Sequence, residues 1–333
     1  MTDQPPIGVG IIGLGFMGRT HAAAYAAANE AGYPNRLVAV YDKLHTPSSV
    51  AKGNLELSTE NAKLFEDERL RHHASPAALL ADPEVELVSI CTPTDSHVDL
   101  AIAALEAGKH VLVEKPVALS STEVERLADA ARAATTLCMP AMCIRFWPGW
   151  NWLEQAIKLG TYGAVRSAVF RRLASPPTWS PEFYKDATRT GGALFDLHVH
   201  DVDFIRWCFG APDSVLSTGS VNHVTSVYRY ANGPEHVVAE GGWIAPDEGD
   251  FLMRYTVVFE HATADYESGR EHPLQLVRDG ARDPIDLEPG TGYDGEIRHF
   301  LQACRSESPR LTATIDDAVE LTRLIEAERD SLS

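Results

Sequence analysis

The sequence predicts an α/β protein of two domains, in which a doubly wound parallel sheet comes first and a region of antiparallel strands follows. Short apolar runs alternate with helix-like segments over the first part of the chain, which is typical of a parallel sheet. A glycine cluster directly follows the first apolar run. In the second part, successive strand-like runs lack helices between them. At 333 residues, the chain is long enough for two hydrophobic cores.

The first part alternates strands and helices. Apolar, largely β-branched runs predict strands at residues 7–12, 37–41, 85–91 and 111–113, each ending at a turn. Helices are expected between them, at residues 19–29, 75–80, 97–107 and 121–134. A Ser-Pro pair opens the second helix and a Ser-Ser-Thr-Glu capping pattern opens the fourth. Residues 43–73 show no regular pattern.

The second part is built differently. One long helix is expected at residues 192–208, and two closing helices are expected at 293–304 and 316–330. Between them, strand-like runs follow one another and should pair antiparallel. Their expected bounds are 214–221, 226–230, 236–244, 251–259, 263–267 and 274–277.

Composition excludes several classes of protein. With 44% hydrophobic and 23% charged residues, the chain has the composition of a folded globular protein. Its net charge of −18 repels phosphate backbones and anionic lipids, so neither nucleic acid nor a membrane is an expected partner. The five cysteines contain no Cys-x-x-Cys, which argues against a disulfide framework or a structural zinc site. With a polar N-terminus and no long apolar run, the expected location is cytoplasmic.

The glycine cluster G-L-G-F-M-G predicts a dinucleotide-binding turn of the Rossmann type, because it follows a strand and opens a helix. Gly13 would permit the tight turn, Gly15 would let the backbone approach a pyrophosphate, and Gly18 would allow close packing of helix and strand. Phe16 and Met17 lie between them at the helix N-terminus, where anions bind.

Asp42 ends the second predicted strand, where an acid can accept hydrogen bonds from the adenosine ribose. A carboxylate there disfavours the 2′-phosphate of NADP. NAD is therefore the expected cofactor, although the neighbouring Lys43 leaves NADP possible.

Ligands of a doubly wound sheet bind beyond the carboxyl ends of its strands. Lys115 stands there, and a partly desolvated lysine can donate a hydrogen bond to a substrate oxygen. Glu114 beside it is either part of the site or a structural carboxylate. The other candidates at these strand ends are Thr92, Pro93, Thr94 and His97.

A polar constellation lies on the long predicted helix. Asp196 and His200 are one helical turn apart, and Asp203 follows on the same face. Histidine is the natural general acid or base near neutral pH, and a neighbouring carboxylate can orient its ring. A metal site would compete for Asp196, His198, His200, Asp201 and Asp203. However, His198 and His200 point in different directions on a helix, so we predict no metal.

Four motifs taken together resemble the Gfo/Idh/MocA family, the glucose–fructose oxidoreductase and inositol dehydrogenase group, along essentially the whole chain. They are G-L-G-F-M-G at 13–18, C-T-P-T-D-S-H at 91–97, V-E-K-P at 113–116 and G-G-A-L-F-D-L-H-V-H-D-V-D at 191–203. The resemblance implies an NAD(P)-binding Rossmann domain at residues 1–120. It also implies a substrate-binding and oligomerisation α/β domain at 121–333, with a large open, mostly antiparallel sheet and the final helix packing back on the first domain.

The resemblance also implies roles for individual residues. Lys115 is similar to the lysine that polarises the substrate hydroxyl, His200 to the proton-transfer histidine, and Asp196 to the carboxylate before it. Pro93 and His97 resemble the residues that flank the nicotinamide.

The chain departs from the family pattern at His198, where many members have glycine, so this imidazole is a candidate substrate contact. Residues 143–150 and 171–180 resemble parts of a substrate wall. Arg145 and Trp147 are the candidates there, although Trp147 could equally belong to the core.

The expected function is hydride transfer between NAD(P) and a ring hydroxyl of a sugar, sugar derivative or cyclitol, by a homodimer or homotetramer. One alternative is a non-redox sugar enzyme that works through a transient ketone, by glycosidic cleavage, elimination or epimerisation. A second is a non-catalytic NAD-binding sensor, for which Lys115, Asp196 and His200 would not be needed.

Overall fold

The computed structural model describes residues 5–44, 65, 67–177, 181–244 and 251–332. The chain forms two compact units. The first comprises Met1–Cys143 and Thr291–Glu320, and the second comprises Ile144–Gly290 and Leu321–Ser333. The first unit therefore extends beyond residue 120, because helix α4 (Ser121–Ala133) and strand β6 (Cys138–Pro140) belong to it.

The first unit contains a six-stranded parallel sheet with strand order β3-β2-β1-β4-β5-β6. The other strands are β1 (Ile7–Ile12), β2 (Asn35–Tyr41), β3 (Arg71–His72), β4 (Leu87–Ile90) and β5 (His110–Val113). Every residue of β1 is buried, as a central strand covered on both faces requires. The predicted parallel sheet is confirmed, and the short strand β3 falls in a segment without a sequence pattern.

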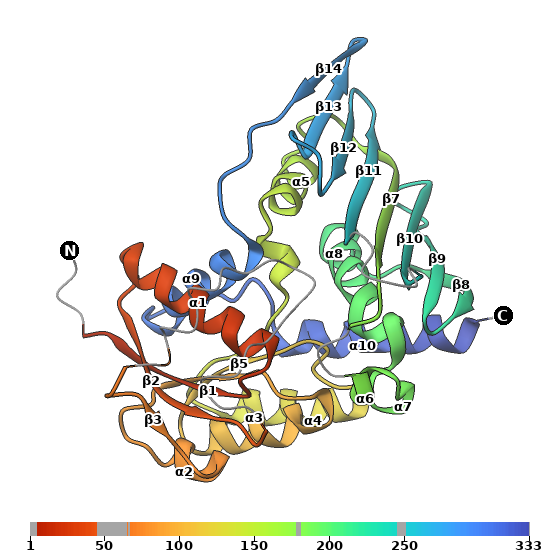
Figure 1. The fold of residues 1–333 in the computed structure, drawn as a ribbon. Coiled ribbons are helices and arrows are strands. Elements are labelled where there is room, and N and C mark those ends of the chain that lie inside the picture. Colours follow the sequence, from red (N-terminus) through yellow and green to blue (C-terminus); the bar gives the residue numbers. More distant parts are fainter. Residues whose placement is uncertain (1–4, 45–64, 66, 178–180, 245–250, 333) are drawn as a thin grey trace. The chain divides into compact units, whose positions relative to one another are not determined.

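Helices cover both faces of this sheet. Figure 1 shows α1 and α9 on one face and α3 and α4 on the other. The bounds are α1 (Phe16–Glu30), α2 (Pro76–Leu80), α3 (His97–Glu106) and α9 (Gly292–Cys304). Ser75 caps α2 as predicted, with its hydroxyl accepting a hydrogen bond from the amide of Ala78 (3.1 Å). Ser120 is the N-cap of α4, but its side chain makes no cap hydrogen bond.

The second unit contains an eight-stranded sheet in the order β14-β13-β12-β11-β7-β10-β9-β8. All its strand pairs are antiparallel except β7 with β10. The predicted mostly antiparallel sheet is therefore confirmed. The bounds are β7 (Val165–Ala174), β8 (Ser214–Ser220), β9 (His223–Arg229), β10 (His236–Trp243), β11 (Leu252–Phe259), β12 (Thr263–Glu267), β13 (Leu274–Arg278) and β14 (Ala281–Pro284).

The central strand β7 has no counterpart among the predicted strands. It carries the buried Arg172, which interrupts the apolar pattern expected of the covered face. The edge strand β14 is exposed along its whole length, so it lacks an apolar signal as well. Both strands show that pairing partners, and not local hydropathy, place a segment in a sheet.

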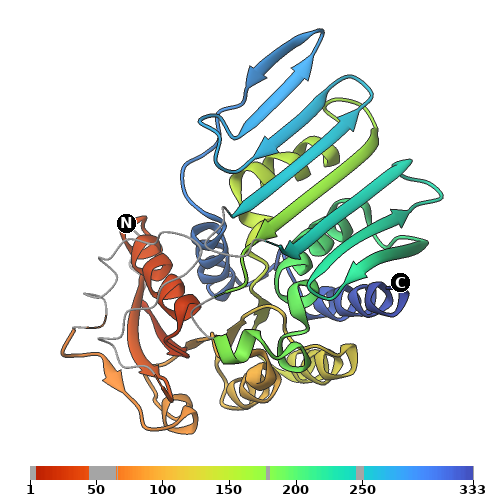
Figure 2. The ribbon, with the colours of Figure 1, turned by 45° about the vertical axis from the view of Figure 1, so that its right-hand side comes forward.

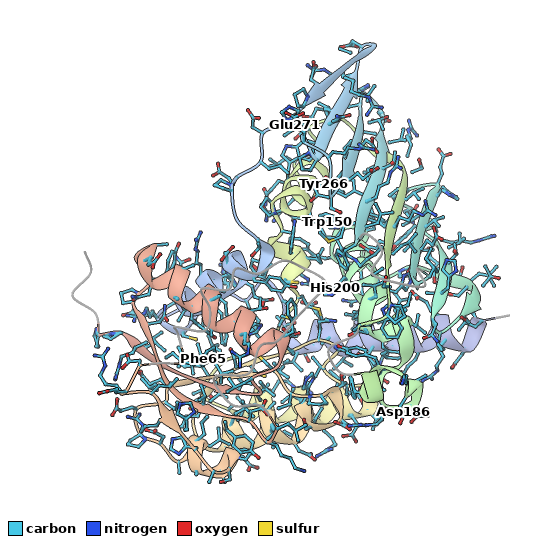
Figure 3. All side chains as sticks on the ribbon, viewed as in Figure 1. Phe65, Trp150, Asp186, His200, Tyr266 and Glu271 are labelled. Atoms are coloured by element: carbon cyan, nitrogen blue, oxygen red, sulfur yellow. The ribbon has the colours of Figure 1, made fainter. Side chains whose placement is uncertain are left out.

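Helices α5 (Pro148–Lys158) and α8 (Val199–Phe209) lie behind this sheet in Figure 2. The other face of the sheet is turned toward the viewer. The indole of Trp150 is fully buried, with ring centroids of Tyr255 and Tyr266 at 5.2 and 4.6 Å. Figure 3 labels Trp150 and Tyr266 in this aromatic core. The remaining helices are α6 (Pro181–Tyr184), α7 (Ala187–Thr190) and α10 (Ile315–Ser331), and α10 begins in the first unit and ends in the second.

Candidate functional site

The glycine turn after β1 has the geometry that each glycine predicts. Gly13 adopts φ 98°, and a Cβ there would lie 2.5 Å from the carbonyl oxygen of Cys91. A Cβ on Gly18 would lie 1.8 Å from the carbonyl oxygen of Gly13, so only glycine lets α1 pack this closely on the turn. Both residues are required by the fold itself.

Gly15 differs, because a Cβ there would meet no atom within 4 Å. Gly15 is also the N-cap of α1 and has no side chain that could cap the helix, and Phe16 and Met17 follow it in the first turn. The backbone amides and the dipole of a helix N-terminus suit the pyrophosphate of a dinucleotide. The residues at this turn therefore fit the expected cofactor.

Asp42 directly follows β2, and its side chain binds the backbone of the glycine turn. Its Oδ2 accepts a hydrogen bond from the amide of Leu14 (2.5 Å), and its Oδ1 accepts one from the amide of Leu44 (2.6 Å). Arg19, which the sequence did not single out, is buried in α1 and donates from Nε to the carbonyl of Leu14 (3.2 Å). Two charged side chains thus hold the middle of the glycine turn.

The loop after β4 is joined to the loop after β5 by His97. Its Nε2 lies 2.7 Å from the carbonyl oxygen of Thr92, and its Nδ1 lies 2.9 Å from that of Pro116. The imidazole is only 1% exposed. His97 therefore has a structural role, because both ring nitrogens face backbone carbonyls, and its expected contact with the cofactor stays a prediction.

The same loop carries the other candidates at the end of β4. The hydroxyl of Ser96 donates to Oγ1 of Thr92 (2.7 Å), and Thr94 begins a short 3-10 turn after Pro93. Thr92 and Thr94 are half-buried and Pro93 is exposed, so all three remain candidates for cofactor contact.

Glu114 is a buried carboxylate that holds the backbone of Lys115. Its Oε1 lies 3.0 Å from Nε2 of His21, and its Oε2 accepts a hydrogen bond from the Lys115 amide (3.0 Å). Burial alone would raise the pKa of Glu114, but the hydrogen bond and charge of His21, together with the charge of Lys115, hold it below its usual value. Glu114 is therefore ionised, and the half-buried Lys115 side chain starts from a fixed backbone.

A polar chain continues from His21 into the core of the first unit. Nδ1 of His21 lies 3.2 Å from the hydroxyl of Ser89, which lies 2.9 Å from the hydroxyl of Tyr25. Sequence reasoning missed these residues because they lie within apolar, alanine-rich segments. A histidine inside such a segment was the one available signal.

The candidate acid–base residues of the second unit lie where a π-helical turn (Leu194–His198) meets α8. The predicted helix begins at residue 192 as expected, but it is π-helical over Leu194–His198 and α-helical only on either side of that turn. Gly191 and Gly192 have positive φ values of 71° and 67°, and such backbone ends the preceding helix α7. π-turns are rare and are frequent at functional sites.

Asp196 and His200 are both half-buried and lie on either side of His198 in the sequence. Figure 3 labels His200 on α8. Lys115 belongs to the first unit, whereas Asp196 and His200 belong to the second. Each unit thus contributes its own candidate groups.

Buried ion pairs anchor the residues that follow His200. Asp201 binds Arg172 through two hydrogen bonds of 2.8 and 3.0 Å, and Asp203 binds Arg145 through two of 2.6 and 2.9 Å. Arg145 is 2% exposed and lies over the ring of Trp207. The structure thus gives the Arg145 guanidinium an ion pair with Asp203, and the expected substrate contact by Arg145 stays a prediction.

His198 is also fully buried, and its Nε2 lies 3.1 Å from Oε2 of Glu328. The imidazole of His198 packs between Glu328 and strand β10, and its expected substrate contact stays a prediction. Trp147 is half-buried at the start of α5 and hydrogen-bonds the side chain of Tyr266. It remains a candidate for the substrate wall, of which residues 178–180 lie outside the described residues.

The described residues contain no group of three or more His, Cys, Asp or Glu side chains placed to hold a metal ion. Within the same part of the chain, no helix is long and apolar enough to cross a membrane.

The parallel sheet, the glycine turn and the acid after β2 define a dinucleotide-binding protein of the Rossmann class. Residues 7–142 match the family of oxidoreductases with an NAD-binding Rossmann fold, and residues 150–269 match the GFO/IDH/MocA C-terminal domain. The chain belongs to the Gfo/Idh/MocA family of oxidoreductases. The predicted family, fold class and NAD cofactor are thereby confirmed.

Two curated relatives and one solved structure illustrate the similarity. Levoglucosan dehydrogenase of Pseudarthrobacter phenanthrenivorans is 32% identical over 64% of this chain, and the match spans only 54% of that relative. UDP-N-acetylglucosamine 3-dehydrogenase of Acidithiobacillus ferrooxidans is 33% identical, with 90% of this chain and 89% of the relative covered. A levoglucosan dehydrogenase solved with NADH and levoglucosan shares the fold, with a TM-score of 0.80, 23% identity and coverage of 98% and 97%.

Proposed function

We propose that this protein is an NAD-dependent dehydrogenase that oxidises a ring hydroxyl of a sugar, sugar derivative or cyclitol. The observation that carries the proposal is Lys115, a half-buried lysine at the carboxyl end of β5 whose backbone is held by the buried Glu114. A cation at that edge of a dinucleotide-binding sheet lies where ligands of such sheets bind. The two curated relatives described above are dehydrogenases named for a sugar and a nucleotide sugar.

Oxidation of a carbinol removes a hydride from carbon and a proton from oxygen. NAD, when bound, supplies the hydride acceptor. In the proposed reaction the ammonium of Lys115 hydrogen-bonds the substrate oxygen and stabilises the negative charge that develops on it. His200 accepts the hydroxyl proton, and Asp196 orients the imidazole and stabilises its charged form. The products are a ketone, a reduced cofactor and a protonated histidine.

The cofactor preference rests on Asp42. We propose that NAD binds more tightly than NADP, because the Asp42 carboxylate lies at the glycine turn and repels a 2′-phosphate.

The open face of the second sheet supports an oligomer. Val169 is 39% exposed on β7, and Val238 and Thr256 are its neighbours on the two adjacent strands. Leu216 on β8 is 61% exposed. We propose that a second copy of the chain covers this face in a homodimer or homotetramer.

One experiment separates the candidate functions. Purified protein is incubated with NAD and a panel of sugars, nucleotide sugars and cyclitols, while NADH and organic product are both quantified. A dehydrogenase forms one NADH per product molecule. Product without NADH would indicate non-redox chemistry through a transient ketone, and cofactor binding with neither would indicate a sensor. Either of these two results overturns the proposed function.

A further inference from the structure

A closed polar cluster lies beneath the π-turn of the second unit. It consists of His198 on the π-turn, Tyr228 on β9 and Glu328 on α10, all three at most 1% exposed. Nε2 of His198 lies 3.1 Å from Oε2 of Glu328, and the hydroxyl of Tyr228 donates to Oε1 (2.7 Å). The sequence separates the two partners of Glu328 from it by 130 and 100 residues, so only the fold assembles this cluster.

The surrounding backbone is shaped for the histidine. A Cβ on Gly241 of β10 would lie 2.7 Å from both Cβ and Nδ1 of His198. The ring is therefore packed against a strand that has no side chain at the point of contact. Any other residue at position 241 would push His198, and with it the π-turn, away from the sheet.

The far end of the cluster is anchored too. The hydroxyl of Ser331 donates to the carbonyl oxygen of Glu328 (2.9 Å), and its oxygen accepts a hydrogen bond from the amide of Ser217 on β8 (3.0 Å). The last turn of α10 is thus attached to the edge of the sheet. Glu328 consequently has little freedom to follow a shift of the π-turn.

The cluster completes a row of buried polar contacts along one helical segment. His198 binds Glu328, Asp201 binds Arg172 and Asp203 binds Arg145. Asp196 and His200 alternate with these anchors and keep partly exposed side chains. His198 lies midway between them, so its position determines how the backbone presents both.

We infer that Glu328, with Tyr228 and through His198, is a positioning residue that sets the orientation of Asp196 and His200. The inference rests on the proposed function, in which these two groups handle the substrate proton. Helix α10, which carries Glu328, would then support the active site although it does not contact the substrate. A misplacement of about 1 Å in a reacting group can lower a rate roughly a hundredfold.

The matched comparison uses two buried tyrosines of the same sheet. Tyr228→Phe removes the hydrogen bond to the Glu328 carboxyl group, whereas Tyr255→Phe removes a hydrogen bond from an equally buried hydroxyl to the carbonyl oxygen of Gly149 (2.8 Å). Both tyrosines are fully buried, so each variant should lose thermal stability, and melting temperatures of the two variants measure that loss separately from the rate. We expect only Tyr228→Phe to lower kcat, with KM nearly unchanged.

Rescue at position 198 provides the second measurement. His198→Ala removes the imidazole whose Nε2 lies 3.1 Å from Oε2 of Glu328, and it should lower kcat by roughly ten- to a hundredfold. His198→Gln places an amide N–H near the position of Nε2, so it should restore most of the rate. Equal losses in the alanine and glutamine variants, or equal kcat in Tyr228→Phe and Tyr255→Phe, would overturn the inference.

Amide hydrogen exchange of residues 194–200 tests the cluster independently of turnover. Exchange should be faster in Tyr228→Phe and His198→Ala than in the unchanged protein and in Tyr255→Phe. If the sugar panel yields no NADH while this difference is present, the proposed function fails and the anchoring stands. If turnover is found and exchange is the same in all variants, the proposed function stands and the positioning role fails.

Discussion

The carboxylate of Asp42 accepts a hydrogen bond from the backbone amide of Leu14, with Oδ2 and the nitrogen 2.5 Å apart. Asp42 therefore holds the backbone of the glycine turn, in addition to the expected role of accepting hydrogen bonds from the adenosine ribose. Substitutions at this position change both the charge near the ribose and the conformation of the turn. Two variants can separate these effects.

Asp42→Asn keeps an acceptor for Leu14 but removes the negative charge, whereas Asp42→Ala removes both. Both variants should narrow the preference for NAD over NADP by about tenfold, because the repulsion of a 2′-phosphate is lost. Only the alanine variant should also bind NAD more weakly through loss of the turn, by about 1 kcal/mol. Calorimetric titration at one ionic strength measures the affinities of the unchanged protein and both variants for NAD and for NADP. Equal affinities in the unchanged protein would disprove the preference.

Lys115→Met should lower turnover by about 10² to 10⁴ and leave the affinity for NAD nearly unchanged, because Lys115 lies outside the glycine turn. Steady-state kinetics on a verified substrate and a separate NAD titration test both statements. Lys158→Met is the matched control, since the Lys158 side chain is 70% exposed on α5. A Lys115 variant that keeps more than about a tenth of the turnover refutes the assigned role.

His200→Ala should cause a comparable loss. In combination with Lys115→Met the losses should be less than additive, since both groups act on the same hydroxyl proton. For sugar oxidation, kcat/KM of the unchanged protein should rise across about pH 5 to 8, where histidines lose their proton, and this rise should be absent in His200→Ala. An identical pH profile in the two proteins would remove His200 from the proton transfer.

Glu296 on α9 is fully buried, and neither carboxylate oxygen has a hydrogen-bond partner among the described residues. Burial, and secondarily the charge of Glu114, raise the pKa of Glu296 well above its usual value. The unfolded chain ionises this group at about pH 4.3, whereas the folded protein keeps it protonated. The contribution of Glu296 to stability is therefore present below that pH and is lost as pH rises toward the folded-state pKa.

Glu296→Gln removes this pH dependence. Relative to the unchanged protein, the variant should gain about 1 kcal/mol or more in unfolding free energy at pH 8 compared with pH 4. Denaturant unfolding at the two pH values measures the difference. A constant difference between variant and unchanged protein at both pH values would show that Glu296 titrates normally.

The open sheet face predicts the behaviour of surface variants. Val169→Glu places a charge in the face that we propose a second copy covers, so it should convert a dimer or tetramer to monomers. Leu159→Glu, at an exposed position after α5, is the control and should leave assembly unchanged. Light scattering at micromolar concentration measures the molar mass of the unchanged protein and of both variants. A monomeric unchanged protein would disprove the proposed assembly.

Local sequence accounts well for the first sheet and its glycine turn. Strand β1 is a short apolar run, and Gly13, Gly15 and Gly18 follow at fixed spacing, so backbone sterics and hydropathy act within a few residues. Strand β7 could not be found in this way. Its buried Arg172 is tolerated only because Asp201 pairs with it, and that partner lies on another element.

By itself, therefore, the sequence determined the family, the Rossmann class, the dinucleotide turn and the identity of Lys115, Asp196 and His200 as candidates. Tertiary structure decided which polar residues remain accessible. Arg145 and His198 carry chemistry suited to a site, yet each is buried against a carboxylate far along the chain, Asp203 and Glu328 respectively. Burial and pairing depend on contacts between distant segments, and a residue pattern read along one strand or helix does not contain them.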